Sequence, residues 1–252
     1  MAAMQVSGNR MKMHSQHGFT LIELVIIILV IGVLATVAVQ KMNTTIDTAT
    51  MEQTKAEMDQ LAIAILGNPN SYTSGAQASF GYVGDVGALP GNLDALAVNP
   101  GLANWHGPYI GKGFESGEYK RDGWGVDYAY NGLQLRSTGS GTTIDKQIAS
   151  SMTALFSNTV TGSVVDANRI PPNASWRDSL SVQLLYPNGV GGTTVQLDTL
   201  DSDGRFTFSN VPIGNHTLRI IYNPATDTMR YSVTVLPGRT ATMEIVCPAD
   251  LW

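Results

Sequence analysis

The regular patterning of the chain begins with a continuous apolar run. From Phe19 to Val39 the sequence holds 21 residues and a single charge, at Glu23. At about 1.5 Å of rise per residue, such a run forms a helix of roughly 31 Å, enough to cross the hydrocarbon core of a bilayer. The pattern therefore predicts a membrane-crossing helix over residues 19–39, with one carboxylate near its start that an apolar environment makes costly.

The helical periodicity continues beyond the apolar run, but as a single stripe. Apolar or small side chains recur at spacings of 3, 4, 3 and 4, with charged residues between them, at Met51, Thr54, Met58, Leu61 and Ile65. This spacing is typical of a helix with one covered face. Stop signals in "GNPNSY" follow Leu66, so we expect one helix over residues 19–66 with a bare first half and a covered second half.

The next region changes from helical periodicity to loops. Residues 67–148 are rich in Gly, Pro, Asn and aromatic side chains, and they predict short strands and turns, with a short helix capped by Asn92. A further helix is expected between Ile144 and Phe156, so residues 149–158 are interpreted as a helical linker.

From Thr159 onward apolar side chains alternate with polar ones. The alternation recurs between turn sequences such as "PNGVGG", "DSDG", "VPIG" and "LPG". About seven short strands at intervals of roughly ten residues predict an antiparallel β-sandwich over residues 159–252. The expected fold class is thus α+β: a long N-terminal helix packed on a small αβ head, followed by a seven-stranded sandwich.

Charge and composition exclude one class of partner. Residues 1–18 carry only two charges, Arg10 and Lys12, and without this stretch 13 basic residues face 20 acidic ones. So acidic a chain is a poor candidate for electrostatic binding to nucleic acid, and we expect no such partner.

Candidate chemistry is sparse. Cys247 alternates with Met243 and Ile245 and is expected to be a buried hydrophobe, and no histidine pair has the spacing of metal ligands. "DSDG" at residues 201–204 opens like a calcium loop, but the later ligands are missing and a hairpin turn is favoured. No catalytic or cofactor motif is present, so the sequence does not predict an enzyme.

The stretch Gly18-Phe19-Thr20-Leu21-Ile22-Glu23, followed by an apolar helix, closely resembles the class III signal of type IV pilins and type II secretion pseudopilins. The resemblance implies that a prepilin peptidase cuts between Gly18 and Phe19, removes residues 1–18 as a leader and N-methylates Phe19. It further implies that Glu23 pairs with the new amine of a neighbouring subunit during assembly.

Two other interpretations of this stretch remain open. A secretory signal peptide would be cleaved after the apolar run, where "ATVAVQ" offers a poor site. A plain membrane anchor would make Gly18 and Glu23 incidental. Sequencing the N-terminus of the mature protein separates the three.

Residues 18–148 extend the resemblance. "GPYI", "DGWGVDYAY" and "STGSG" are similar to the "GPYL", "DPWGxxYxY" and "SxGxDG" order of major type II pseudopilins. Gln40 stands where many members have proline, so any softening of the helix would come from Gly32. The family also implies a calcium site, but the loop "GSGTTID" offers only Asp145 and does not support one.

Residues 159–252 resemble the carboxypeptidase regulatory-like, or transthyretin-like, β-sandwich. "VQLDTLDSDGRFTFSNVPIGNHTLRI" follows that pattern of strand, D-x-D-G turn, F-x-F strand and P-x-G turn. The resemblance implies a fold and no ligand.

These resemblances imply a structural filament subunit, of a type II secretion pseudopilus or a type IV pilus-like fibre. Its expected partners are further copies of itself, the prepilin peptidase, the inner-membrane assembly machinery and minor pseudopilins. It would reside in the bacterial inner membrane as a single-pass protein, and then in a periplasmic pseudopilus or a cell-surface filament. The alternative is a minor or tip pilin that displays the sandwich as an adhesive or cargo-binding module.

Overall fold

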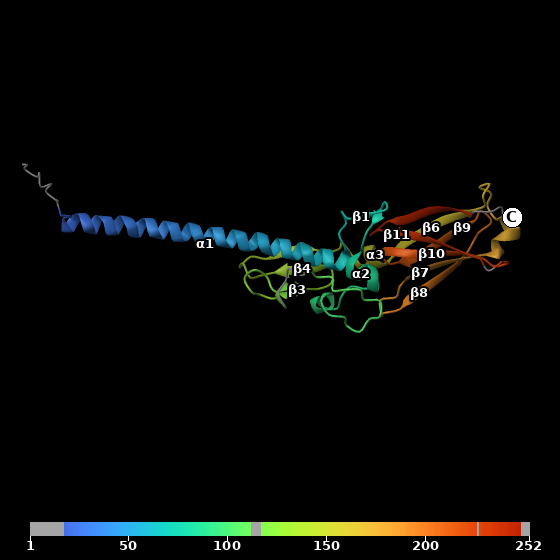
Figure 1. Cartoon of the computed structure of the whole chain (residues 1–252), viewed down its shortest axis with the longest axis horizontal. Coiled ribbons are helices and arrows are strands. Elements are labelled where there is room, and N and C mark those ends of the chain that lie inside the picture. The colour runs from blue at the N-terminus through green and yellow to red at the C-terminus, as the bar shows by residue number, and fades with distance from the viewer. Residues whose placement is uncertain (1–17, 112–116, 226, 248–252) are drawn as a thin grey trace, which may run out of the picture. The chain divides into compact units, whose positions relative to one another are not determined.

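The computed structural model describes residues 18–111, 117–225 and 227–247 (Figure 1). The chain divides into two units, one before and one from Thr50 onward. The long helix α1 (Leu21–Leu66) belongs to both, because its last turns form part of the second unit. The α+β class predicted from the sequence, with a long N-terminal apolar helix and a sheet-rich remainder, is confirmed.

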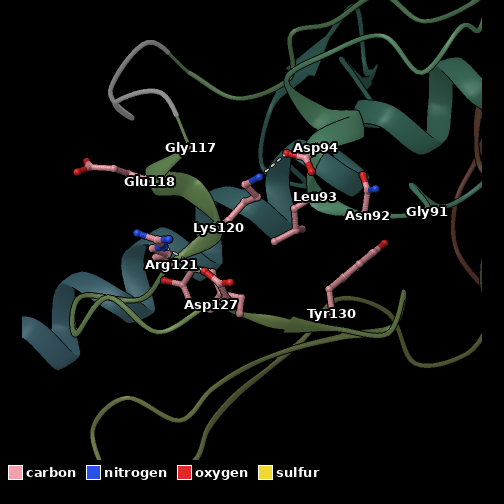
Figure 2. A pocket seen from close by; sticks show the side chains of 11 residues that line it. Gly91, Asn92, Leu93, Asp94, Gly117, Glu118, Lys120, Arg121, Asp127 and Tyr130 are labelled. Atoms are coloured by element: carbon pink, nitrogen blue, oxygen red, sulfur yellow. Dashed lines mark hydrogen bonds and ion pairs between the residues drawn. The ribbon is translucent and has the colours of Figure 1, made fainter.

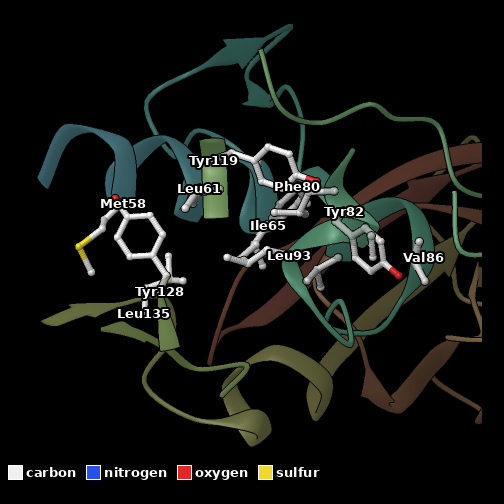
Figure 3. Packing of buried hydrophobic residues seen from close by; sticks show 14 of the residues in the cluster. Met58, Leu61, Ile65, Phe80, Tyr82, Val86, Leu93, Tyr119, Tyr128 and Leu135 are labelled. Carbon is white, nitrogen blue, oxygen red and sulfur yellow. The ribbon is translucent and has the colours of Figure 1, made fainter. Parts of the chain in front are cut away.

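The covered stripe of α1 lies where the spacing predicts it. The buried side chains of the helix are Thr54, Met58, Leu61, Ala64 and Ile65. We define the head as residues 50–148. The four apolar members of this set pack into its core together with aromatic and aliphatic side chains from its loops and short elements (Figure 3). Burial of this stripe fixes the second half of α1 in the second unit.

The head is built from short elements. They are β1 (Tyr72–Thr73), β2 (Ala76–Gln77), α2 (Gly81–Val86), 3-10 turns at Leu93–Leu96 and Glu118–Lys120, and the antiparallel sheet of β3 (Ala129–Tyr130), β4 (Gln134–Ser137) and β5 (Ile144–Gln147). The predicted cap at Asn92 is confirmed, since its Oδ1 accepts a hydrogen bond from the Ala95 N–H at 3.2 Å.

The prediction that a helix starts at Ile144 is wrong. Residues Ile144–Gln147 form β5, which pairs with β4, and only α3 (Met152–Phe156) is helical. The helix begins where Ser151 Oγ accepts a hydrogen bond from the Ala154 N–H at 3.1 Å. A side-chain cap therefore sets the boundary that periodicity alone placed too early.

The sandwich, residues 158–247, has seven strands within the part of the chain that the structure describes. They are β6 (Asn158–Val165), β7 (Leu180–Pro187), β8 (Thr193–Thr199), β9 (Arg205–Val211), β10 (Gly214–Tyr222), β11 (Asp227–Val235) and β12 (Thr240–Val246), with the short turns α4 (Asn173–Trp176) and Arg177–Ser179 between β6 and β7. One sheet has the order β11-β10-β7-β8 and the other β12-β6-β9. Their inward side chains form a single core, in which Cys247 is buried as expected.

One pairing differs from the antiparallel arrangement that the spacing predicts. Strands β6 and β12 pair in parallel, from Thr159 opposite Thr240 to Val165 opposite Val246. Alternation along a sequence identifies which side chains face inward but carries no information on strand direction. A parallel pair needs a long connection, and here the other five strands supply it.

Strand β8 turns its polar side chains toward the interior. Its residues Gln196 and Asp198 lie opposite the buried Leu184 and Val182 of β7. Asp198 Oδ2 accepts a hydrogen bond from the Thr207 N–H of β9 at 2.7 Å, so this carboxylate joins the two sheets along one edge. The apolar side chains of β8 consequently face outward.

The "DSDG" segment is a turn, but it does not form a hairpin. The Asp201 carboxylate accepts hydrogen bonds from the backbone N–H groups of Asp203 and Arg205, at 2.9 and 2.8 Å. The strands that it joins, β8 and β9, lie in different sheets. The carboxylate that opens the calcium-like pattern is therefore used to shape the turn.

Head and sandwich meet in a packed contact within the second unit. Ile213, in the turn before β10, is 1% exposed and belongs to the core of the head. Its N–H donates to the Leu155 carbonyl oxygen at 2.8 Å, and Asn215 Nδ2 donates to the Gln77 carbonyl oxygen at 2.9 Å. The sandwich is thus held by core packing, by one backbone hydrogen bond and by one side-chain hydrogen bond.

Candidate processing and assembly site

The residues that resemble a processing signal lie directly before and inside the first turn of α1. Gly18 to Thr20 are not helical, and the helix begins at Leu21. The Thr20 carbonyl oxygen accepts from the Leu24 N–H at 3.1 Å, and Thr20 Oγ1 accepts from the Glu23 N–H at 3.3 Å. Thr20 is therefore the N-cap of α1, and Glu23 takes the third helical position, which is the residue spacing of a capping box. The Thr-x-x-Glu spacing in the sequence already contained this signal, which our sequence analysis missed.

The packing of the fold makes no use of the residues that define the signal. A Cβ atom placed on Gly18 would meet no atom within 4 Å. Phe19 is 72% exposed, and in the described structure Glu23 forms no ion pair. Packing in the subunit therefore explains neither the glycine, the phenylalanine nor the carboxylate.

The helix that follows presents a fully exposed apolar surface. Every residue from Leu21 to Ala49 is exposed, and this helix is long and apolar enough to cross a membrane. An apolar surface of this extent is unstable in water, so it requires a bilayer or other protein around it.

Threonine side chains in the exposed part of α1 donate hydrogen bonds to its own backbone. The Oγ1 atoms donate to carbonyl oxygens four residues earlier in the pairs Thr36–Gly32, Thr44–Gln40, Thr45–Lys41 and Thr48–Thr44. Helix α1 is continuous through both Gly32 and Gln40. Softening at Gly32 during assembly stays a prediction.

In the head, the loop "DGWGVDYAY" is organised by one buried carboxylate. Asp122 is 4% exposed and accepts four hydrogen bonds, from Ser137 Oγ (2.6 Å) and from the N–H groups of Trp124, Val126 and Gly139 (3.0, 2.9 and 3.0 Å). Burial raises the pKa of Asp122, whereas the four hydrogen-bond donors lower it. The donors together outweigh burial, so the pKa lies below the usual aspartate value. The ionised carboxylate of Asp122 therefore holds the loop in place.

The same loop docks on α1. The Gly123 N–H donates to Thr54 Oγ1 at 3.0 Å, and Tyr128 donates its hydroxyl to Glu57 Oε2 at 3.1 Å. These bonds join the loop to the covered stripe of the helix. A proline at position 123, as in the family pattern, would lack the N–H that Thr54 accepts from.

Replacing Gly123 with alanine should weaken this docking. The added Cβ would lie 2.5 Å from Thr50 Cγ2 and 3.1 Å from Thr54 Oγ1. We expect a loss of about 1–3 kcal/mol in the free energy of unfolding, measured by chemical denaturation in detergent. Gly125→Ala is a poor control because Gly125 has a positive φ; Gly91→Ala, which meets no atom within 4 Å, should cost far less. Equal losses in the two variants would contradict the docking.

Asp145, the one acidic residue of the loop "GSGTTID", lies in β5 with both carboxylate oxygens engaged. Arg136 Nε and Nη2 donate to Oδ1 and Oδ2 at 2.7 and 3.0 Å. The Arg136 guanidinium lowers the pKa of Asp145. Across residues 18–111, 117–225 and 227–247, no three His, Cys, Asp or Glu side chains are grouped to hold a metal ion.

A cavity of about 710 Å³ opens in the head beside the 3-10 turns (Figure 2). Four of its five charged side chains pair with one another: Lys120 Nζ lies 2.8 Å from Asp94 Oδ1, and Arg121 Nε lies 3.1 Å from Asp127 Oδ1. Hydrogen bonding to Lys120 lowers the pKa of Asp94. This mutual pairing is typical of a structural surface, and the cavity brings together none of the residues of the processing signal.

Comparison with known proteins bears directly on the N-terminus. Residues 13–39 match the family described as the prokaryotic N-terminal methylation motif. The match spans Gly18, Phe19 and Glu23, together with the exposed apolar part of α1. No curated protein matches the chain.

Solved structures are similar to parts of the chain, at low identity. The dioxygenase domain of a dioxygenase–carbohydrate-binding fusion from Streptomyces sp. SirexAA-E is 14% identical, over 40% of this chain and 86% of that one, with a TM-score of 0.30. A streptococcal ancillary pilin is 16% identical, over 41% of this chain and 34% of that one, with a TM-score of 0.25. The major pilin subunit of Bacillus cereus is 13% identical, over 45% of this chain and 36% of that one, with a TM-score of 0.24. At these scores the likenesses carry no argument about function.

The methylation motif and the exposed helix agree with each other. The motif is a prepilin-type signal, which implies a peptidase and assembly with further copies of the chain. The apolar helix behind it fits a membrane-anchored precursor. The chain therefore has the N-terminal organisation of a pilin-type filament subunit.

Proposed function

We propose that this chain is a structural subunit of a type II secretion pseudopilus or a closely related type IV pilus-like filament. Its role is mechanical rather than catalytic. A prepilin peptidase removes residues 1–18 and methylates Phe19, and α1 then leaves the inner membrane to form the filament core. The assembly machinery and minor pseudopilins are its further partners, and the filament extends through the periplasm or to the cell surface.

One observation carries this proposal: the fold does not require the residues of the signal. Gly18 has open space around it, Phe19 is exposed, and Glu23 has no ion-pair partner in the described structure. These residue types are nevertheless combined in a matched methylation motif. Their requirement must then come from partners, and a peptidase and neighbouring subunits are the partners that such a motif implies.

The head supports the pseudopilin assignment within the pilin type. Its sequence order resembles that of major pseudopilins, and the loop "DGWGVDYAY" packs on α1 through Gly123 and Tyr128. Two departures from that group are Gln40, where many members have proline, and the loop "GSGTTID", whose one acidic residue, Asp145, pairs with Arg136.

Replacing Gly18 with leucine tests the processing step. Because a side chain at residue 18 meets no atom of the fold, the variant should fold and insert normally but stay at precursor length. Intact-mass spectrometry of the membrane fraction measures this directly. Gly32→Leu in the same apolar segment, where a Cβ also has open space, is the matched control and should be cleaved. Normal cleavage of Gly18→Leu would contradict the proposal.

A second candidate function is display at a filament tip. The packed contact through Ile213 and Asn215 favours it, because a sandwich held in this way presents its surface in a fixed orientation. Copy number distinguishes the two: quantitative mass spectrometry should find a main subunit dominant in purified filaments and a tip protein scarce. Deleting the sandwich is not a clean test, since it would also remove Ile213 from the core of the head.

A further inference from the structure

The sheet β11-β10-β7-β8 has an outward side whose composition the fold does not explain. Strand register arranges its side chains in three rows that cross the strands from β8 to β11. We define the outer face as these rows: Thr199, Ser181, Ile221 and Thr228; Leu197, Gln183, Arg219 and Arg230; Val195, Leu185, Thr217 and Ser232. Their sequence neighbours, such as Val182, Leu184, Leu218 and Ile220, fill the core of the sandwich.

Two arginines lie directly opposite each other on this face. Arg219 of β10 pairs in register with Arg230 of β11, and like charges in this position destabilise a sheet. Within the described residues neither guanidinium forms an ion pair, and the Nε of Arg219 is buried with no hydrogen-bond partner.

Four basic side chains of the described residues form no ion pair, and they are Arg219, Arg230, Lys41 and Arg239. Ion pairs engage the basic side chains Lys55, Lys120, Arg121, Arg136, Lys146, Arg169, Arg177 and Arg205. The chain as a whole is acidic, with 20 acidic and 15 basic residues, yet the outer face has no Asp or Glu. The outer face therefore carries a local positive charge that no acidic side chain of the face neutralises.

Exposed aliphatic side chains lie at the opposite edge of the same face. Leu197 and Val195 of β8 are 66% and 48% exposed, and Val195 lies opposite Leu185 of β7. Strand β8 pairs only with β7, so it is an edge strand. Side chains alternate along a strand, so the apolar side chains of β8 face outward because Gln196 and Asp198 face inward.

The spacing between the two features suits an extended polypeptide. Leu197, Gln183, Arg219 and Arg230 occupy one row on four neighbouring strands. With strands about 4.8 Å apart, the aliphatic edge lies roughly 10–14 Å from the arginines, which an extended chain covers in about three or four residues.

We propose that the outer face binds an extended acidic polypeptide segment of another protein. An apolar side chain of the segment packs on Leu197 and Val195, and acidic side chains three or four residues further along pair with Arg219 and Arg230. Guanidinium groups bind carboxylates through two parallel hydrogen bonds. The face has no aromatic side chain on which a sugar ring could stack, which favours a polypeptide over an anionic polysaccharide. This surface goes beyond filament assembly, which uses α1.

A defined peptide tests the proposal. The probe is a fluorescein-labelled peptide with two leucines followed, four residues later, by three glutamates, titrated with the full chain in detergent micelles and followed by anisotropy. The double variant Arg219→Gln/Arg230→Gln should bind at least about tenfold more weakly, as should wild-type protein with the glutamates changed to glutamines. The matched control, Arg169→Gln/Arg205→Gln, changes two exposed arginines off this face and should bind as wild type does.

Thermal unfolding separates this role from a structural one. Removing a repulsive pair should leave the melting temperature of Arg230→Gln unchanged or raise it, even as binding weakens. A lower melting temperature would mean that the arginines support the fold, and would overturn the proposal. So would equal weakening in the control variant, no binding of the peptide, arginine-dependent binding of polygalacturonate in its place, or self-association of the chain that the double variant abolishes.

Discussion

Replacing Glu23 with leucine should leave the chain membrane-inserted and processed but should stop its incorporation into filaments. In our account the Glu23 carboxylate meets the new amine of Phe19 from a neighbouring subunit, inside an apolar helical core. Removing one member of a buried charge pair costs about 2–5 kcal/mol. Incorporation should therefore fall by at least about 30-fold. Purified filaments from cells that express mutant and wild-type chains together measure the ratio directly.

The size of this effect decides between two roles for Glu23. Its position in the first turn, after the Thr20 cap, also lets the carboxylate stabilise its own helix. That contribution is about 0.3–1 kcal/mol, so its loss would reduce incorporation at most about fivefold.

Thr20→Val is the matched control, because it removes the cap and keeps the carboxylate. It should assemble nearly as well as wild type. A small loss in Glu23→Leu, similar to that in Thr20→Val, would contradict the intermolecular pair.

Replacing Asp122 with alanine should cost the head about 3–5 kcal/mol of unfolding free energy, because four donors lose their common acceptor, a buried carboxylate. For a chain of this size we expect a melting temperature lower by roughly 10 °C, measured by near-UV circular dichroism in detergent. Asp127→Ala is the control in the same loop. Asp127 pairs with Arg121 at the surface, so its loss should cost at most about 1 kcal/mol. Similar losses in both variants would mean that Asp122 does not organise the loop.

The stability contributed by Asp122 should depend on pH with a defined sign. Its folded-state pKa is lowered, since the hydrogen bonds outweigh the effect of burial. The contribution is then complete above the unfolded value of about 3.9 and is lost as the pH falls through the lower folded value. The difference in stability between wild type and Asp122→Ala should accordingly shrink in acid. A difference that stays constant from neutral pH down to pH 3 would show that the ionised carboxylate is not what holds the loop.

Features set by local periodicity could be predicted from the sequence. The stripe of Met58, Leu61 and Ile65, the N-cap at Asn92 and the burial of Cys247 all appear in the structure as expected. In each of them the residue type and its near neighbours determine the outcome. A helix or strand face depends on spacing, and a cap depends on one side chain and the next turn.

Features set by partners far apart in the sequence could not be predicted in the same way. The parallel pairing of β6 with β12 and the inversion of β8 depend on contacts across the sandwich. The role of Asp122 as a common acceptor depends on Ser137 and Gly139, which only the fold brings to it. The row that joins Leu197 to Arg230 follows from register, which alternation does not contain.

For the candidate site, too, the local sequence predicts one part and the structure supplies the other. Gly18, Phe19 and Glu23 form a local motif, so the sequence was sufficient to find them. The structure adds that packing inside the subunit does not account for them. A requirement outside the subunit is therefore the physical basis of the proposed function.

The most direct test of this account is the mass of the N-terminal peptide in purified filaments. We predict that the chain begins at Phe19 and carries one methyl group on its amine. A chain that begins at residue 1 or 2, or that is cleaved after the apolar run, would contradict the account.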